Sequence, residues 1–195
     1  MRLLFQTPFC SRIKGKNDLM NQRPLVTTQD WFGQTWPFAP SMSFEVIGDR
    51  FLFRFEAPKA PRCDLSLGLG DFVEGLWERD VAEFFVAGIG PSYQEINISP
   101  TGAWWSAVFS DYRELKSVAQ FEPKITADWS DQRWAVSFES DLYDLEPWRE
   151  SGPDQRLISP AAILHTPEPH YFAWNHRGDG EPDFHRSDLF KPIGC

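Results

Sequence analysis

The stretch SFEVIGDRFLFRF, residues 43–55, decides the fold class of this chain. Phe44 and Val46 stand two positions apart before Gly48-Asp49, and three phenylalanines with the same spacing follow, at Phe51 to Phe55. A period of two places apolar side chains on one face of a strand, and a Gly-Asp pair is typical of the turn between two strands. The stretch therefore predicts an antiparallel β-hairpin with one buried face.

Short apolar runs bounded by turn residues continue this pattern toward the C-terminus. No long amphipathic helix interrupts them, and a helical turn is expected only near Leu142 to Trp148. Many short strands separated by turns favour two packed sheets over an alternating arrangement of strands and helices. We therefore expect an all-β, antiparallel, jelly-roll-like two-sheet sandwich with little helix. Besides the hairpin, strands are expected at residues 81–87, 93–98, 103–109, 125–129, 134–138, 161–164 and 171–174.

Residues 1–40 show no sustained period and mix Pro, charged and aromatic residues. We expect them to form an irregular arm on the body of the protein, not a second domain. The whole chain, residues 1–195, is then one domain, which is long enough to bury roughly 70% of the surface of its unfolded form. The aromatic residues that the arm is expected to pack against the body are Trp31, Phe32, Trp36 and Phe38.

Composition and charge exclude several classes of function. The net charge of −9 repels a phosphate backbone, and no cluster of Lys and Arg offsets it, so no nucleic acid is expected. No apolar run is long enough to span a membrane, and the run at residues 1–5 is too short for a signal peptide. Cys10, Cys63 and Cys195 lack the spacing of a disulfide framework. We expect a soluble, cytoplasmic protein.

The segment GLWERDVAEFFV, residues 75–86, is the first whose residue types indicate ligand binding. A loop with Trp77 and acidic residues runs directly into an expected strand, which favours exposure of the Trp77 ring. Such a ring stacks on the C–H face of a sugar, while a carboxyl such as that of Glu83 binds hydroxyls in the plane of the sugar. Glu83 has a second interpretation, as an outward residue of an edge strand or the partner of an arginine. Core packing is expected for Trp104, Trp105, Trp129, Trp134 and Trp148.

Three segments resemble, in the same order, motifs of the family 9 carbohydrate-binding modules, which have a DOMON-like sandwich fold. The first is the pattern Trp77-Glu78, Asp80, Glu83 and Phe85, and the second is the strand and turn at residues 93–102. The third combines residues 173–175 with residues 183–190. The resemblance covers residues 40–195 and implies a lectin-like, non-catalytic domain that clamps a sugar between two aromatic rings.

The resemblance also implies which residues bind the ligand. Phe184 stands where sugar-binding members have Trp, and Glu95 stands where they have an Arg, whose donors a carboxylate cannot replace. The expected ligand is therefore a small saccharide or another small molecule. The implied stacking rings are Trp77 and Phe184, with Trp174 in the same final motif, and the implied polar contacts are Glu83, Asn175, His185 and Arg186.

Two other functions stay open. Related sandwiches hold haem through Met and His ligands, and Met42 is the methionine within the sandwich region. The same acidic and aromatic end of the sandwich could also recognise a protein partner. The first alternative requires space between the sheets, whereas the second requires an exposed surface.

No cofactor or enzyme activity is expected. Calcium occurs in relatives, but no residue here can be nominated as its ligand. Asp179, Glu181 and Asp183 lack the ligand spacing of a calcium-binding loop. The four histidines, which all lie from His165 onward, match no zinc spacing. A serine-nucleophile motif and a nucleotide-binding glycine pattern are both missing from the sequence. Glu78, Asp80, Glu83 and Glu95 supply carboxylates for a glycosidase, but acids are too common to indicate one.

Overall fold

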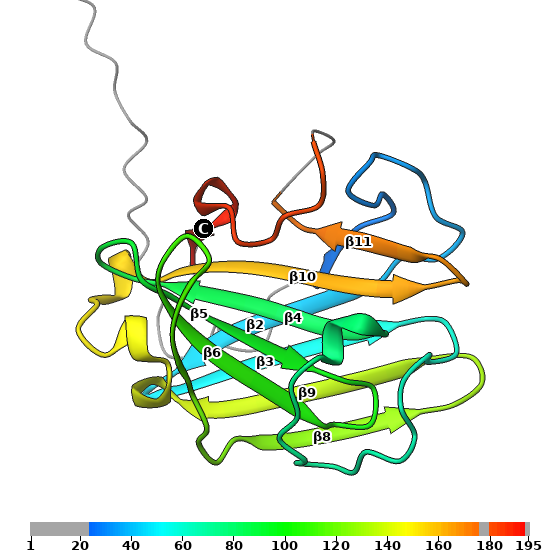
Figure 1. Cartoon of the computed structure of the whole chain (residues 1–195), viewed down its shortest axis with the longest axis horizontal. Coiled ribbons are helices and arrows are strands. Elements are labelled where there is room, and N and C mark those ends of the chain that lie inside the picture. The colour runs from blue at the N-terminus through cyan, green and yellow to red at the C-terminus, as the bar shows by residue number, and fades with distance from the viewer. Residues whose placement is uncertain (1–23, 176–179, 194–195) are drawn as a thin grey trace, which may run out of the picture.

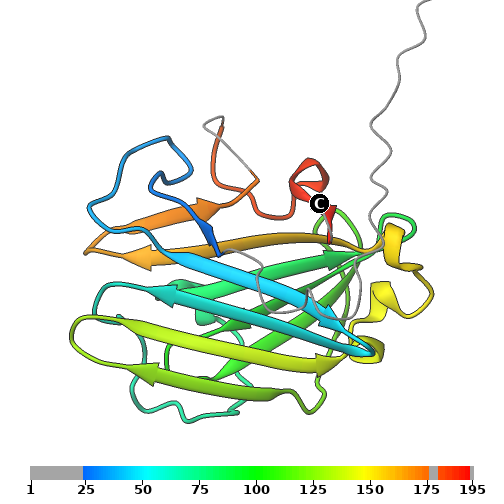
Figure 2. The ribbon, with the colours of Figure 1, turned by 180° about the vertical axis from the view of Figure 1, so that it is seen from behind.

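The computed structural model describes residues 24–175 and 180–193, and they form two antiparallel sheets packed face to face (Figures 1 and 2). This confirms the predicted two-sheet β-sandwich. The helices are single 3₁₀ turns at Leu76–Glu78, Leu142–Asp144, Glu146–Trp148, Pro153–Gln155 and Ser187–Leu189. The strands are β1 Leu25–Val26, β2 Ser41–Ile47, β3 Arg50–Ala57, β4 Val81–Ala87, β5 Tyr93–Ile98, β6 Trp104–Asp111, β7 Glu114–Val118, β8 Lys124–Trp129, β9 Trp134–Asp141, β10 Leu157–His165, β11 Pro169–Ala173 and β12 Lys191–Pro192.

The two sheets differ in size. The five-stranded sheet has the order β1-β2-β3-β9-β8, and the seven-stranded sheet has the order β11-β10-β4-β5-β6-β7, with β12 also paired to β10. Within the described ranges no helix is long and apolar enough to cross a membrane.

The hairpin that decided the fold class forms as expected, from β2 and β3. Gly48 takes a left-handed φ of 62° in its turn, a conformation that glycine adopts without steric strain. Phe51 and Phe53 are fully buried and meet Phe84 of the other sheet, with ring centroids 5.2 and 4.7 Å from it. These rings fill the space between the sheets.

Two strand predictions, at residues 81–87 and 93–98, coincide with β4 and β5, and the other predicted strands differ from the structure only at their ends. The helical turn expected at residues 142–148 is present as two 3₁₀ turns. β7 was not predicted, because all five of its residues are exposed and it has no apolar face. The expectation that Trp129 lies in the core was wrong, since this residue ends β8 and is 48% exposed.

The described part of the N-terminal arm contacts both sheets. β1 pairs with β2, and the Trp31 indole is buried over the seven-stranded sheet, where its Nε1 donates to the Gly180 carbonyl. Phe32 is exposed, in contrast to our expectation, because Asp30 Oδ1 accepts the Phe32 and Gln34 amides and closes a tight turn. Trp36 and Phe38 pack against the sandwich core. Residues 1–23 of the arm lie outside the described residues.

The seven-stranded sheet carries apolar side chains on both faces. In β4, Phe84 and Val86 point into the sandwich core, whereas Phe85 and Ala87 belong to a second apolar cluster on the opposite face. This explains why β4 and β5 are buried along their whole length. Residues from outside the sheet complete the second cluster. They are Trp31 of the arm and Phe184, Leu189 and Phe190 of the C-terminal segment. We call this C-terminal segment, residues 180–190, the cover.

Candidate functional site

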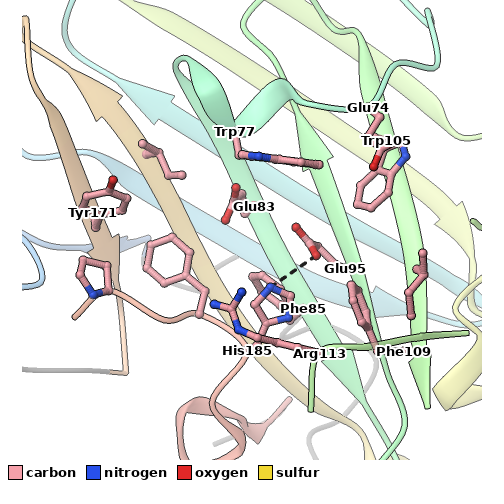
Figure 3. A pocket seen from close by; sticks show the side chains of 14 residues that line it. Glu74, Trp77, Glu83, Phe85, Glu95, Trp105, Phe109, Arg113, Tyr171 and His185 are labelled. Atoms are coloured by element: carbon pink, nitrogen blue, oxygen red, sulfur yellow. Dashed lines mark ion pairs between the residues drawn. The ribbon is translucent and has the colours of Figure 1, made fainter. Parts of the chain in front are cut away.

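A pocket of about 430 Å³ opens on the outer face of the seven-stranded sheet, beside the cover (Figure 3). Its floor consists of side chains from β4, β5 and β6, and its walls come from the turn before β4, the β6–β7 turn, β10, β11 and the cover. The lining residues are Glu74, Trp77, Glu83, Phe85, Glu95, Trp105, Phe109, Arg113, Leu115, Ile163, Tyr171, Pro182, Phe184 and His185.

Strand register brings two carboxyl groups together on the pocket floor. Glu83 of β4 lies opposite Asn97 of β5, and Phe85 lies opposite Glu95. Glu83 and Glu95 are therefore diagonal neighbours on one face of the sheet, within reach of each other's side chains. Asn97 Nδ2 donates to Glu95 Oε1 at 2.8 Å. Glu83 is 2% exposed, and Glu95 is 7% exposed.

Trp77 forms the side of the pocket opposite the cover. Gly75 turns the chain with a φ of 86°, and the buried Leu76 anchors the 3₁₀ turn that carries Trp77. The Trp77 indole remains 37% exposed and meets Trp105 edge-on, with ring centroids 5.3 Å apart. Figure 3 shows Glu83 and Glu95 between Trp77 on one side and His185 on the other. The pocket thus has an exposed ring above two buried carboxyls.

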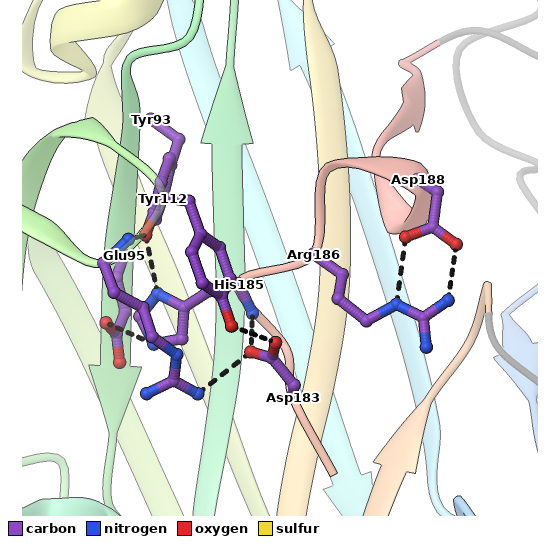
Figure 4. A network of polar contacts seen from close by, with 8 residues as sticks. Tyr93, Glu95, Tyr112, Asp183, His185, Arg186 and Asp188 are labelled. Carbon is purple, nitrogen blue, oxygen red and sulfur yellow. Dashed lines mark hydrogen bonds and ion pairs between the residues drawn. The ribbon is translucent and has the colours of Figure 1, made fainter. Parts of the chain in front are cut away.

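A hydrogen-bond chain orients His185 (Figure 4). The Arg113 amide donates to the Tyr93 hydroxyl at 3.0 Å, and this hydroxyl lies 2.7 Å from His185 Nδ1. A hydroxyl donates one hydrogen bond and accepts others, so the protonation of the imidazole decides which atom of this contact is the donor. The other ring nitrogen, Nε2, faces Glu95 Oε2 at 3.9 Å.

Burial keeps the floor groups close to neutral. It lowers the pKa of His185 to about 4, and the nearby Arg113 charge acts in the same direction. Burial raises the pKa of Glu95 to about 7, although the Asn97 hydrogen bond and Arg113 oppose this. Burial together with the charge of Glu95 raises the pKa of Glu83 well above its ordinary value. An ion pair between His185 and Glu95 is therefore disfavoured at neutral pH, because burial opposes both charges.

Of the seven residues that the resemblance implied, four line this pocket: Trp77, Glu83, Phe184 and His185. The ligand-binding role of all seven stays a prediction. The Phe184 ring is 7% exposed and is held edge-on by Trp31 at 5.8 Å, with Tyr171 at 6.2 Å.

The other three residues have different contacts. Trp174 packs on the sandwich core, with its ring centroid 6.2 Å from that of Phe55. Asn175 Nδ2 donates to the Leu189 carbonyl at 2.8 Å and so fastens the cover. The Arg186 guanidinium pairs with Asp188 and lies 5.9 Å from the Trp31 ring centroid. The contacts of Asn175 and Arg186 position the cover. The neighbouring residues Phe184 and His185 form the pocket wall.

Sequence reasoning missed several lining residues. Trp105 was expected to be a core residue, and although it is buried it also borders the pocket. Arg113 and Tyr171 reach the pocket from the β6–β7 turn and from β11. Their sequence signal was weak, because neither belongs to a motif. Asp80 of the first motif lies outside the pocket, where it is fully buried and accepts the His165 amide at 2.7 Å.

The described residues do not form a haem or metal site. Met42, the candidate haem ligand, is buried in the sandwich core, opposite Phe55 on the neighbouring strand. Within the described ranges, no group of three or more His, Cys, Asp or Glu is placed to hold a metal ion. His176 and Asp179 lie outside those ranges.

The fold has a solved counterpart. It is similar to the crystal structure of a putative carbohydrate-binding protein from Bacteroides uniformis ATCC 8492, with a TM-score of 0.64. The two chains are 17% identical over 86% of this chain and 83% of that chain. No family model and no curated protein matches the sequence. The comparison shows a shared fold, whereas membership of family 9 stays a prediction.

Proposed function

We propose that the pocket beside the cover binds a saccharide and that the protein performs no chemistry on it. The observation that carries this proposal is the half-exposed Trp77 ring above the buried carboxyls of Glu83 and Glu95. A ring beside converging polar groups is the arrangement that a pyranose requires, because its C–H face is apolar and its edge carries hydroxyls.

The lining residues supply both donors and acceptors for sugar hydroxyls. A carboxyl that holds its proton, as burial favours for Glu83, both donates and accepts. The His185 ring offers Nε2 as a hydrogen-bonding atom, and the Arg113 guanidinium offers N–H donors, which the Glu95 carboxylate lacks. The fold of a putative carbohydrate-binding protein supports the same assignment.

In this proposal Phe184 is the second ring that contacts the sugar, and Tyr171 is its neighbour. Both line the pocket on the side formed by the cover and β11. Since the cover is fastened through Asn175 and Leu189, this wall is in place before a ligand arrives. Binding then requires little ordering of the chain, which favours affinity.

A calorimetric and thermal-shift screen of mono- and disaccharides tests the proposal, because a ligand of the native state raises the melting temperature. We expect at least one sugar to stabilise the wild type and a Trp129→Ala control, but not Trp77→Ala. Trp129 is a matched control, since it is exposed on the other sheet. Unchanged stability with every sugar at tens of millimolar would overturn the proposal and favour a protein-interaction module. Release of a cleaved sugar in the same samples would overturn its non-catalytic part.

A further inference from the structure

Glu83 is a buried carboxyl without a partner. It is 2% exposed and lines the pocket, yet among the residues that the structure describes it makes no hydrogen bond and no ion pair. An acid that is so little exposed and has no protein partner is uncommon in native proteins. Because Glu83 borders the pocket, its partner comes from what fills the pocket, which is water or a ligand. Figure 3 shows Glu83 on the open side of β4, below Trp77.

Among the residues that the structure describes, no cation of the pocket lining is free to neutralise the two carboxyls. Arg113 Nη2 binds Asp183 Oδ1 at 2.9 Å, so its charge is already matched. Burial lowers the pKa of His185 to about 4, so this ring is neutral at neutral pH. Glu74 adds a third acid to the lining. The described lining thus holds more acidic than basic groups, and aromatic rings border the same space.

From this arrangement we infer that the saccharide bound here carries a primary ammonium group, so that its ligand class is the amino sugars with a free amine. The inference rests on the proposed function. An ammonium has three N–H donors, enough to bind Glu83 and Glu95 together, and its charge favours the ionised forms of carboxyls that burial otherwise keeps protonated. It is also attracted by the faces of Trp77 and Trp105, which border the same space.

A neutral sugar meets the same floor less favourably. Its hydroxyls can bind the carboxyls, but they carry no positive charge, so they cannot form an ion pair with either group. An N-acetylated sugar replaces the ammonium by an amide with a single donor. The pocket should therefore discriminate among three sugars that differ at one substituent only.

The test is a calorimetric titration at about pH 6.5, where an amine of this type is protonated. The probes are matched sets of a hexose, its 2-amino-2-deoxy form and the N-acetyl form, in the gluco, galacto and manno series, together with cyclohexylamine as an amine that is not a sugar. We expect the amino sugar of one series to bind about tenfold more tightly than its hexose, or better. Its binding should release protons, measured as a difference in heat between phosphate and ACES buffers, which both buffer at this pH and contain no primary amine.

Two variants locate the effect. Glu83→Gln keeps the shape of the side chain and should reduce the affinity ratio of amino sugar to hexose to about one, with hexose binding retained. Glu78→Gln removes an exposed acid near Trp77 that does not line the pocket, and it should leave the ratio unchanged. Melting temperatures of both variants check that they are folded.

The outcomes separate the two proposals. Equal affinity for an amino sugar and its hexose would overturn the ammonium inference and leave saccharide binding intact. Binding of cyclohexylamine without any sugar would overturn saccharide binding and retain an ammonium site. If none of the probes binds, both proposals fail.

Discussion

The Tyr93 hydroxyl lies 2.7 Å from Nδ1 of His185, a residue 92 positions later in the chain. Tyr93 belongs to the sheet and His185 to the cover, so this contact joins the pocket floor to its wall. The same hydroxyl accepts the Arg113 amide, which connects the β6–β7 turn to the pair.

Tyr93→Phe should weaken this junction. The Arg113 amide loses its acceptor and His185 Nδ1 loses its hydrogen-bond partner, at a cost of about 1–3 kcal/mol in the free energy of unfolding. Urea unfolding measures this loss. Tyr143→Phe, whose ring is 71% exposed, is the control, and equal behaviour of the two variants would contradict the assignment.

Glu95→Gln should change how stability depends on pH. The folded state raises the pKa of this carboxyl from 4.5 to about 7, so it retains a proton that the unfolded chain has released between these values. The wild type should therefore lose stability relative to Glu95→Gln as pH rises from 4.5 to 7, by an amount on the order of 3 kcal/mol, and no further above that.

Urea unfolding at a series of pH values measures this difference directly. The two proteins share every other titrating group, so their difference reports position 95 together with the shift that its charge imposes on Glu83. Glu74, Glu83, Arg113 and His185 line the same pocket, Tyr93 is close enough to feel the Glu95 charge, and all of them are retained in the variant. A difference that does not vary with pH would show that Glu95 titrates normally.

Asp80→Asn should be strongly destabilising. The carboxyl is fully buried, accepts the Arg62 amide at 2.8 Å and the His165 amide at 2.7 Å, and pairs with Lys59, whose side chain is 8% exposed. Loss of the charge leaves a buried lysine uncompensated, which costs about 3–5 kcal/mol. Asp141→Asn is the matched control.

The control removes an exposed ion pair. Asp141 binds Arg50 at 2.7 Å but is 54% exposed, so its removal should cost less than about 1 kcal/mol. The free energy of unfolding, measured in urea, compares the two variants. Similar losses in both would mean that the pair of Lys59 and Asp80 is not decisive for stability.

Gly88→Ala should disturb the junction between the end of β4 and the 3₁₀ turns. An added Cβ would lie 2.1 Å from the Pro147 carbonyl oxygen, closer than any real contact allows, so the backbone would have to move. We expect a loss of about 1–3 kcal/mol or more. At Gly152 the nearest atom is 3.4 Å from an added Cβ, so Gly152→Ala should be tolerated. Thermal melts of both variants give the comparison, and a native melting temperature for Gly88→Ala would contradict it.

The sequence predicted the strands with an apolar face well. The period of two in residues 43–55 identified β2 and β3, and the compact apolar run at residues 81–87 identified β4 without error in its bounds. β7 was not predicted, because the sandwich buries none of its residues. Its side chains therefore do not alternate between apolar and polar types. Hydrophobic periodicity arises from a buried face, so it cannot identify a strand that has none.

The candidate site was predictable only in part. Trp77 and Glu83 lie close together in the chain and share one motif, which is why a local pattern found them. Arg113 and Tyr171 meet them only because β6, β10 and β11 share a sheet, and that arrangement depends on contacts between distant segments. The interpretation of Trp105 as a core residue was incomplete, because a buried residue can still border a cavity.

The two-faced sheet has a consequence for how such a protein can change its ligand. Glu83 and Glu95 alternate along their strands with residues of the sandwich core, so the floor cannot shift without repacking the domain. The cover is one chain segment, and it contributes Phe184 and His185 to the wall. New specificity can therefore arise by substitution or exchange of this segment, while the residues that specify the fold are kept.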